Sequence, residues 1–201
     1  MDKALLEATA AALVAPGKGI LAADESNGTM TKRLEGVGLE SSEEARRAYR
    51  ANLFATPGCE SAVSGVILYD ETIRQNMDDG TPIPDYLNSR GIIPGIKVDT
   101  GAKKLAKSEN EKITEGLDGL RERLKNYYNL GARFTKWRAV YTISDQFPSK
   151  LAVDTNAHAL ARYSALVQEA GMVPIVEPEV CLLYTSPSPR DATLAGIPAC
   201  A

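Results

Sequence analysis

Short apolar runs alternate with longer segments of helical periodicity along this chain. The apolar runs predict five strands, at 19–23, 62–69, 92–99, 131–140 and 172–179. Helix-start and helix-stop residues between them predict helices over 2–15, from Thr29, over 43–56, from Thr72, and over 84–89, 117–130 and 154–170. Nearly continuous apolar strands that alternate with helices are typical of βα units, so we expect an α/β fold with a parallel sheet.

The strand at 131–140 shows the two-residue period most clearly. Phe134, Lys136 and Arg138 fall on one face, and Trp137 lies on the other. An unpaired charge is costly in a core, so we expect both cations to have partners or a chemical role. An edge strand with its charges in water is the simpler alternative for this segment taken alone.

Two stretches break the alternation. Residues 100–112 are polar and predict a long surface loop. Residues 181–201 lack periodicity and contain Ser-Pro-Ser-Pro at 186–189. We therefore expect one domain over 1–180, and a tail over 181–201 that is foreign to it and either disordered or artefactual.

Composition excludes several classes of protein. The chain has 201 residues, 44% of them hydrophobic, and a net charge of -3. It lacks an apolar run long enough to cross a bilayer, a signal-peptide pattern and a basic cluster suited to nucleic acid, so we expect an intracellular protein that binds neither membrane nor nucleic acid. The only histidine, His158, lies within a predicted helix, and Cys59, Cys181 and Cys200 have no paired spacing. A Ser-His-Asp mechanism, a zinc site and a disulfide framework are therefore not expected, and we predict no metal or cofactor.

Ionisable residues follow the carboxyl side of every predicted strand. They are Asp24, Asp70, Glu71, Lys97, Asp99, Lys136, Arg138, Glu177 and Glu179. In a closed parallel barrel these ends meet at one mouth, whereas in an open doubly wound sheet they would line a crevice, although no G-x-G-x-x-G motif follows a strand. Lysines among carboxylates suit imine chemistry, and by this pattern alone Lys136 is the candidate nucleophile. Lysine and arginine together also suit an anionic substrate, commonly a phosphate.

Four motifs make the sequence recognisable. G-I-L-A-A-D-E-S at 19–26, G-I-K-V-D at 95–99, F-T-K-W-R at 134–138 and V-P-I-V-E-P-E at 173–179 closely resemble class I fructose-1,6-bisphosphate aldolase, from about Pro16 to Val180. The resemblance implies a (βα)8 TIM barrel. It also implies reversible cleavage of fructose 1,6-bisphosphate to dihydroxyacetone phosphate and glyceraldehyde 3-phosphate through a lysine Schiff base, without metal.

The resemblance also implies roles for individual residues. Asp24 would handle the proton of the substrate hydroxyl, and Glu177 would serve as acid and base for the imine. Lys136 and Glu179 would control the charge of Glu177 and position the substrate. Substrate phosphate or hydroxyl groups would be contacted by Ser26, Thr29, Arg33, Lys97 and Arg138. Two simpler interpretations remain open at this stage: Lys97 as the ion-pair partner of Asp99, and Asp24 as a helix cap.

The chain departs from the family pattern after Val180. About five of eight barrel strands are present, and the resemblance places the imine-forming lysine on a strand that is missing, which argues against Lys136 in that role. We therefore expect an aldolase-family lyase segment that is inactive alone. The alternatives are a non-catalytic sugar-phosphate-binding or scaffolding protein and another imine-forming barrel such as a transaldolase. The family implies a homotetramer and a cytoplasmic location, or a plastid if a transit peptide was lost.

Overall fold

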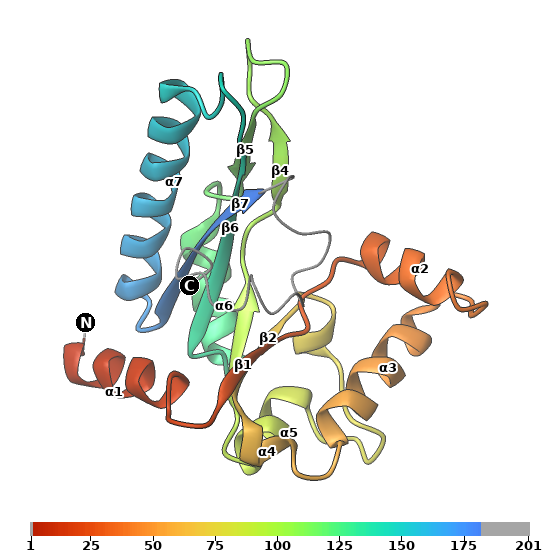
Figure 1. Ribbon diagram of the computed structural model, residues 1–201. Coiled ribbons are helices and arrows are strands. Elements are labelled where there is room, and N and C mark those ends of the chain that lie inside the picture. Colours follow the sequence, from red (N-terminus) through yellow and green to blue (C-terminus); the bar gives the residue numbers. More distant parts are fainter. Residues whose placement is uncertain (1, 182–201) are drawn as a thin grey trace.

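The computed structural model describes residues 2–181, and five parallel strands form its main sheet (Figure 1). Their order in the sheet is β1-β2-β3-β6-β7. The bounds are β1 (Gly19–Ala22), β2 (Val63–Leu68), β3 (Ile93–Lys97), β6 (Phe134–Thr142) and β7 (Val173–Cys181). The α/β class and all five predicted strands are confirmed. β6 pairs with β3 on one side and β7 on the other, so its interpretation as an edge strand is wrong.

One helix precedes β1, and the others lie between consecutive strands of the main sheet. The helices are α1 (Lys3–Leu13), α2 (Asn27–Glu35), α3 (Glu43–Ala55), α4 (Cys59–Ala62), the 3-10 turn η1 (Thr72–Arg74), α5 (Ile83–Ser89), α6 (Leu120–Asn129) and α7 (Lys150–Glu169). α7 begins four residues before the predicted start at Asp154, because the hydroxyl of Ser149 accepts a hydrogen bond from the Ala152 amide and caps the helix.

The polar stretch predicted as a surface loop contains a second, two-stranded sheet. β4 (Gly101–Lys104) and β5 (Lys112–Glu115) pair antiparallel, so the loop prediction is wrong. The hydroxyl of Thr114 donates to the Arg138 carbonyl at 2.6 Å, and the Glu111 carboxylate accepts from the Ser149 amide at 2.7 Å. These contacts join the β4–β5 hairpin to β6 and to the start of α7, which compensates for its low hydrophobicity.

The two faces of the main sheet carry different side chains. The face covered by helices is apolar, and there the rings of Trp137 and Tyr163 lie 5.3 Å apart. On the opposite face, Phe134 is fully buried in a second cluster with Leu13 of α1 and Ile67 of β2. The predicted separation of Phe134 and Trp137 to opposite faces of β6 is therefore confirmed.

The second face changes character along the strands. Near their amino ends it carries Phe134 and Ile93, whose cluster fills the space above the sheet. Two to four residues further along the strands, the same face carries Lys97, Lys136 and Glu177. This face therefore has an apolar floor at its amino end and a charged rim at its carboxyl end.

Candidate active site

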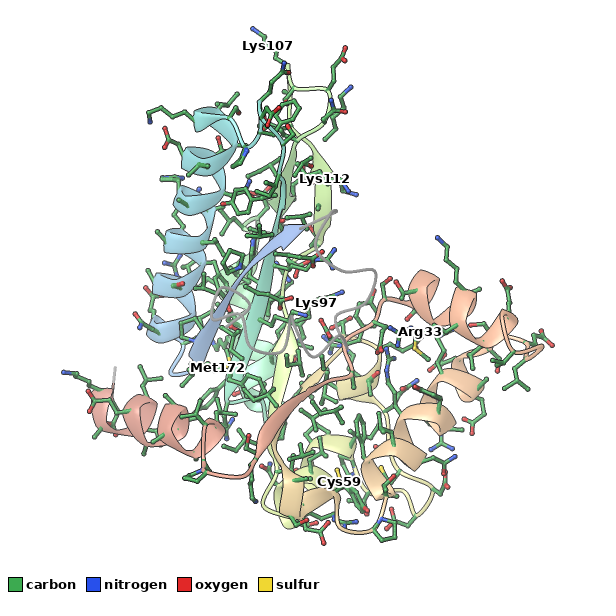
Figure 2. All side chains as sticks on the ribbon, viewed as in Figure 1. Arg33, Cys59, Lys97, Lys107, Lys112 and Met172 are labelled. Carbon is green, nitrogen blue, oxygen red and sulfur yellow. The ribbon has the colours of Figure 1, made fainter. Side chains whose placement is uncertain are left out.

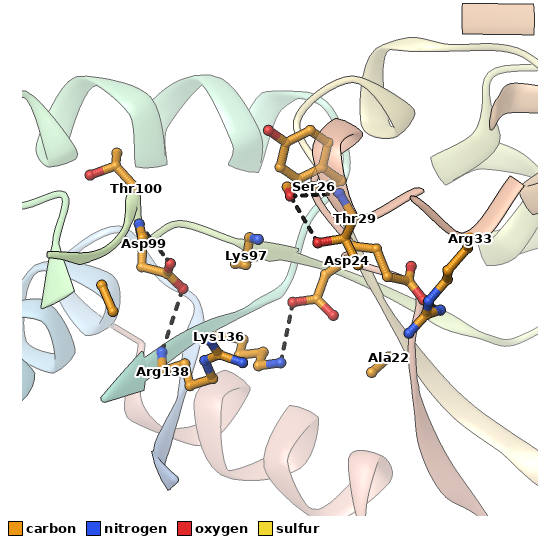
Figure 3. A pocket seen from close by; sticks show the side chains of 14 residues that line it. Ala22, Asp24, Ser26, Thr29, Arg33, Lys97, Asp99, Thr100, Lys136 and Arg138 are labelled. Atoms are coloured by element: carbon orange, nitrogen blue, oxygen red, sulfur yellow. Dashed lines mark hydrogen bonds and ion pairs between the residues drawn. The ribbon is translucent and has the colours of Figure 1, made fainter. Parts of the chain in front are cut away.

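A cavity of about 530 Å³ opens at the carboxyl ends of the strands (Figure 3). The predicted site residues that line it are Asp24, Ser26, Thr29, Arg33, Lys97, Lys136 and Arg138. The remaining two, Glu177 and Glu179, do not line the cavity. They form ion pairs with Lys136 and Arg138, which do line it. The strands and the β1–α2 segment thus bring the predicted residues into one region.

Lys136 lies between two carboxylates at the centre of this region. Its ammonium is 3.2 Å from Asp24 Oδ2 and 3.0 Å from Glu177 Oε2. Lys136 and Asp24 are only 9% and 8% exposed. Burial lowers the pKa of the Lys136 ammonium, but the charges and hydrogen bonds of Asp24 and Glu177 outweigh it and leave the pKa above its ordinary value. Lys136 is therefore held as a cation.

Arg138 and Asp99 form the neighbouring part of the wall. The Arg138 guanidinium pairs with Glu179 at 3.0 Å. One oxygen of Asp99 accepts from the Gly101 amide at 3.1 Å, and the other faces the Arg138 amide at 3.5 Å. Asp99 thus fixes the turn from β3 into the β4–β5 hairpin.

Lys97 does not pair with Asp99. In the described part of the chain its ammonium forms no ion pair, and it lies instead 5.1 Å from the centre of the Tyr69 ring. The ion-pair interpretation of Lys97 is therefore wrong. A cation held on an aromatic face remains able to bind an anion in the cavity.

The turn after β1 places a hydroxyl pair on the cavity wall. Ser26 is the N-cap of α2, and its hydroxyl accepts from the Thr29 amide at 3.4 Å and lies 3.1 Å from the Thr29 hydroxyl. Because Ser26 occupies the cap position, the interpretation of Asp24 as a helix cap is wrong. Asp24 is free to face Lys136 instead.

Arg33, on the last turn of α2, reaches back to the same turn. Its guanidinium pairs with the Glu25 carboxylate, and both residues line the cavity. The other oxygen of Glu25 faces the fully buried Arg50 at 3.6 Å. Beside them, the Glu71 carboxylate accepts two hydrogen bonds from Arg46, at 2.7 and 2.8 Å, and these hold its pKa below the usual range.

Among the charged and aromatic residues of this region, sequence reasoning missed Glu25, Tyr69 and Arg50. Glu25 and Tyr69 line the cavity, and Arg50 contacts Glu25 from behind. Glu25 and Tyr69 directly adjoin Asp24 and Asp70, so their position at strand ends was a usable signal. Arg50 gave no such signal, because a cation within the charged helix sequence E-E-A-R-R-A-Y-R resembles a solvated one.

Other kinds of site have little support among residues 2–181. His158 is exposed on α7 and does not line the cavity. No group of three or more His, Cys, Asp or Glu side chains in this range is arranged to hold a metal ion. Nor does any helix here combine the length and hydrophobicity that crossing a membrane requires.

Comparison with known proteins gives a consistent result. A family model described as fructose-bisphosphate aldolase class-I matches residues 5–184. A probable fructose-bisphosphate aldolase class 1 of Xanthomonas campestris is 59% identical over 88% of this chain and 53% of its own length. The cytosolic fructose-bisphosphate aldolase 6 of Arabidopsis thaliana is 55% identical over 87% of this chain and 49% of its own length. The chain spans about half the length of these relatives.

A solved structure matches the fold as well. The ternary co-crystal structure of Plasmodium falciparum fructose-bisphosphate aldolase, with TRAP and a small molecule inhibitor, superposes with a TM-score of 0.86. It is 47% identical in sequence, and the match covers 88% of this chain and 52% of that one. The five-stranded sheet therefore corresponds to part of a TIM barrel, as predicted.

Proposed function

The chain belongs to the class I fructose-bisphosphate aldolase family, and from that premise we propose that its cavity binds a sugar phosphate for aldol cleavage. The reaction is the reversible cleavage of fructose 1,6-bisphosphate to dihydroxyacetone phosphate and glyceraldehyde 3-phosphate, through a lysine Schiff base. The supporting observation is that Lys97, Lys136 and Arg138, from two adjacent strands, surround one cavity together with the carboxylate of Asp24.

The cations would bind the anionic substrate. Arg33, Lys97 and Arg138 come from α2, β3 and β6 and surround the cavity, so they can contact the phosphate or hydroxyl groups of one ligand. The hydroxyls of Ser26 and Thr29, near the amino end of α2, add polar contacts that suit the same ligand.

The carboxylates would move the protons. Asp24 would take the proton of the substrate hydroxyl as the carbon–carbon bond breaks, and Glu177 would serve the formation and hydrolysis of the imine. The ammonium of Lys136 contacts both carboxylates, at 3.2 Å and 3.0 Å, and so holds them on the same side of the site. Glu179 would restrain Arg138 through their ion pair.

The imine-forming lysine, in this proposal, belongs to a strand outside this chain. A lysine nucleophile needs a neutral amine, and desolvation or nearby cations promote that form. The two carboxylates beside Lys136 do the opposite and raise its pKa. Lys136 is therefore better suited to electrostatic support than to imine formation.

Borohydride trapping tests this assignment. The chain is incubated with dihydroxyacetone phosphate, reduced and mapped by peptide mass spectrometry. We expect no adduct at Lys136 or Lys97. A stable adduct at either lysine would overturn the assignment of the imine to another strand.

A chimera tests the cleavage reaction itself. Residues 1–180 are joined to the second half of the Xanthomonas campestris relative. The first half of that relative is the part that aligns with this chain, at 59% identity. We expect cleavage of fructose 1,6-bisphosphate, and its loss when Asp24→Asn is introduced. A folded chimera that cleaves a different aldol substrate would favour another imine-forming barrel.

Binding without turnover is the alternative for this chain taken alone. Lys97, Lys136 and Arg138 line the cavity, and these cations supply the charge that an anionic ligand needs. Saturable binding of a sugar phosphate without product formation is its signature. Calorimetry paired with a product assay on the same sample distinguishes it from catalysis.

Assembly, location and domain boundaries are proposed from the family. We propose that the whole protein forms a homotetramer and resides in the cytoplasm, or in a plastid if a transit peptide was lost. The incomplete barrel domain over 1–180 also remains a prediction. The foreign tail predicted at 181–201 lies outside the described residues, except for Cys181 at the end of β7.

A further inference from the structure

The chain leaves the sheet directly before its cavity-lining residues. The Ala23 amide still donates to the Ile67 carbonyl of β2 at 3.0 Å, which extends the β1–β2 pairing by one residue. The next three residues, Asp24, Glu25 and Ser26, all line the cavity. Among residues 2–181 these three have no strand partner, so contacts from outside the sheet hold their backbone.

Arg50 of α3 supplies that contact from behind the cavity. One guanidinium nitrogen donates to the main-chain carbonyl of Glu25, and another donates to the Thr72 hydroxyl at 2.8 Å. Thr72 begins η1, just after β2. The guanidinium carbon also lies 5.9 Å from the centre of the Tyr69 ring. Arg50 therefore connects α3 and the end of β2 to the turn after β1.

Burial of the Arg50 guanidinium is unfavourable in free energy. The arginine side chain is fully buried, and burial lowers its pKa despite the nearby charges of Glu25, Glu71 and Asp24. Its Nε atom and the Glu25 Oε2 atom have no hydrogen-bond partner within the described part of the chain. A buried cation with incomplete hydrogen bonding commonly stabilises a fold less than an apolar residue of similar size would.

We propose that Arg50 is a positioning residue for the candidate active site. Through the Glu25 carbonyl it fixes the peptide that joins Glu25 to Ser26, and with it the start of α2. Its charge faces the Glu25 carboxylate, which also pairs with Arg33 on the cavity wall. Arg50 thus sets the placement of Asp24, Ser26 and Arg33 without contacting a ligand in the cavity. The catalytic meaning of this placement rests on the proposed function.

Tyr69 joins the same arrangement to β3. Lys97 lies over its ring at 5.1 Å and Arg50 lies over it at 5.9 Å, so both cations are held by one aromatic side chain. Tyr69 itself lines the cavity. A change at Arg50 is therefore transmitted to both the β1 and the β3 sides of the cavity.

Amide hydrogen exchange of the unliganded chain tests the positioning role directly. Arg50→Lys keeps the charge but cannot reach both the Glu25 carbonyl and the Thr72 hydroxyl with the planar fork of an arginine. The amides of Thr29 and Met30, which donate to Ser26, report on the start of α2. We expect them to exchange about tenfold faster in Arg50→Lys, while the amides of β2 and β3 exchange as before.

Arg133→Lys is the matched control. Arg133 also donates to main-chain carbonyls, those of Tyr128 and Ala132, but it lies at the amino end of β6, away from the cavity. Arg133→Lys should leave the exchange rates of the Thr29 and Met30 amides unchanged. Unchanged exchange of these two amides in Arg50→Lys, or an equal rise throughout the sheet, would overturn the positioning role.

Thr72→Val serves as a second test if Arg50→Lys does not fold. It removes only the hydroxyl that accepts from Arg50, so we expect a rise of about threefold at Thr29 and Met30. No rise at these amides would count against the proposal.

Calorimetric titration with dihydroxyacetone phosphate then tests the catalytic meaning. We expect Arg50→Lys to weaken binding about tenfold, and Arg133→Lys to leave it unchanged. Equal affinity in Arg50→Lys would confine Arg50 to a purely structural role. If the unaltered chain binds no ligand, the proposed function fails, whereas the exchange data still decide whether Arg50 positions the turn.

Discussion

The ammonium of Lys136 lies 3.2 Å from Asp24 Oδ2, although 112 residues separate the two in the chain. The contact joins β6 to the turn after β1 across the face of the sheet (Figure 3). Two other residues that line the cavity, Lys97 of β3 and Arg33 of α2, are labelled in Figure 2. Glu177 of β7 approaches the Lys136 ammonium at 3.0 Å. One lysine therefore links three separate segments of the chain within the candidate active site.

Replacing Asp24 should change the titration of Lys136. In Asp24→Asn the ammonium keeps only Glu177 as a charged partner, so the lysine pKa should fall relative to that of the unaltered chain. NMR of the Lys136 side-chain nitrogen as a function of pH measures the midpoint. Asp99→Asn is the control, because Asp99 lines the cavity without contacting Lys136. Equal midpoints in the two variants would contradict the ion pair between Asp24 and Lys136.

Gly95 of β3 should not tolerate a side chain. A Cβ atom there would lie 2.3 Å from the Phe134 ring, which packs directly on the glycine. We expect Gly95→Ala to lower the free energy of unfolding by about 1–3 kcal/mol, since the Phe134 ring must leave its position in the second cluster, with Leu13 and Ile67. Urea denaturation provides the measurement.

Gly19→Ala is the matched control for Gly95→Ala. Gly19 is also a strand glycine, in β1, but a Cβ atom there meets nothing within 4 Å. The two substitutions add the same methyl group, so any difference reflects the space available. Similar stability of both variants would show that the Phe134 ring does not pack on Gly95 as described.

The ion pair between Glu71 and Arg46 should make stability depend on pH in the acid range. Hydrogen bonds from Arg46 hold the pKa of Glu71 below its ordinary value of 4.5. A lowered carboxyl pKa contributes stability that is complete above the unfolded-state pKa and is lost as pH falls through the folded-state pKa. Glu71→Gln should therefore cost about 1–3 kcal/mol at pH 7 and progressively less below pH 4.5.

Denaturation curves from pH 7 to pH 3 measure this dependence. Glu35→Gln is the control, because Glu35 is an exposed carboxylate on α2 without an ion pair in the described range. Its effect should be small at every pH. A constant difference between Glu71→Gln and the unaltered chain across the range would contradict the stabilising role of the pair.

Strand periodicity was sufficient to predict much of the site. The two-residue period of β6 puts Lys136 and Arg138 on the face of Phe134, and the structure has them there. The apolar runs end in charged residues at the carboxyl ends of parallel strands, so their convergence follows from topology alone. What the period cannot supply is the partner of each charge, which depends on how distant strands are aligned.

The errors have physical causes. The β4–β5 hairpin has the strand sequences G-A-K-K and K-I-T-E, which are mostly polar or small, and it is held by contacts to β6 and α7, so its own sequence resembles a loop. Asp154 is a residue type that commonly caps helices, but the N-cap of α7 is Ser149, so Asp154 lies within the helix. Arg50 was hidden because burial of a helix residue depends on the packing of α3 against η1 and the β1–α2 turn, which local sequence does not encode.

Isothermal titration of the chain with fructose 1,6-bisphosphate tests the central claim most directly. The claim is that charged side chains from separate strands form one site for a sugar phosphate. We predict saturable binding at a single site, lost in Lys97→Met/Arg138→Met and retained in Lys103→Met/Lys104→Met, whose lysines are exposed on β4 outside the cavity. Absence of saturable binding by the unaltered chain, or equal affinity in both double variants, would contradict the claim.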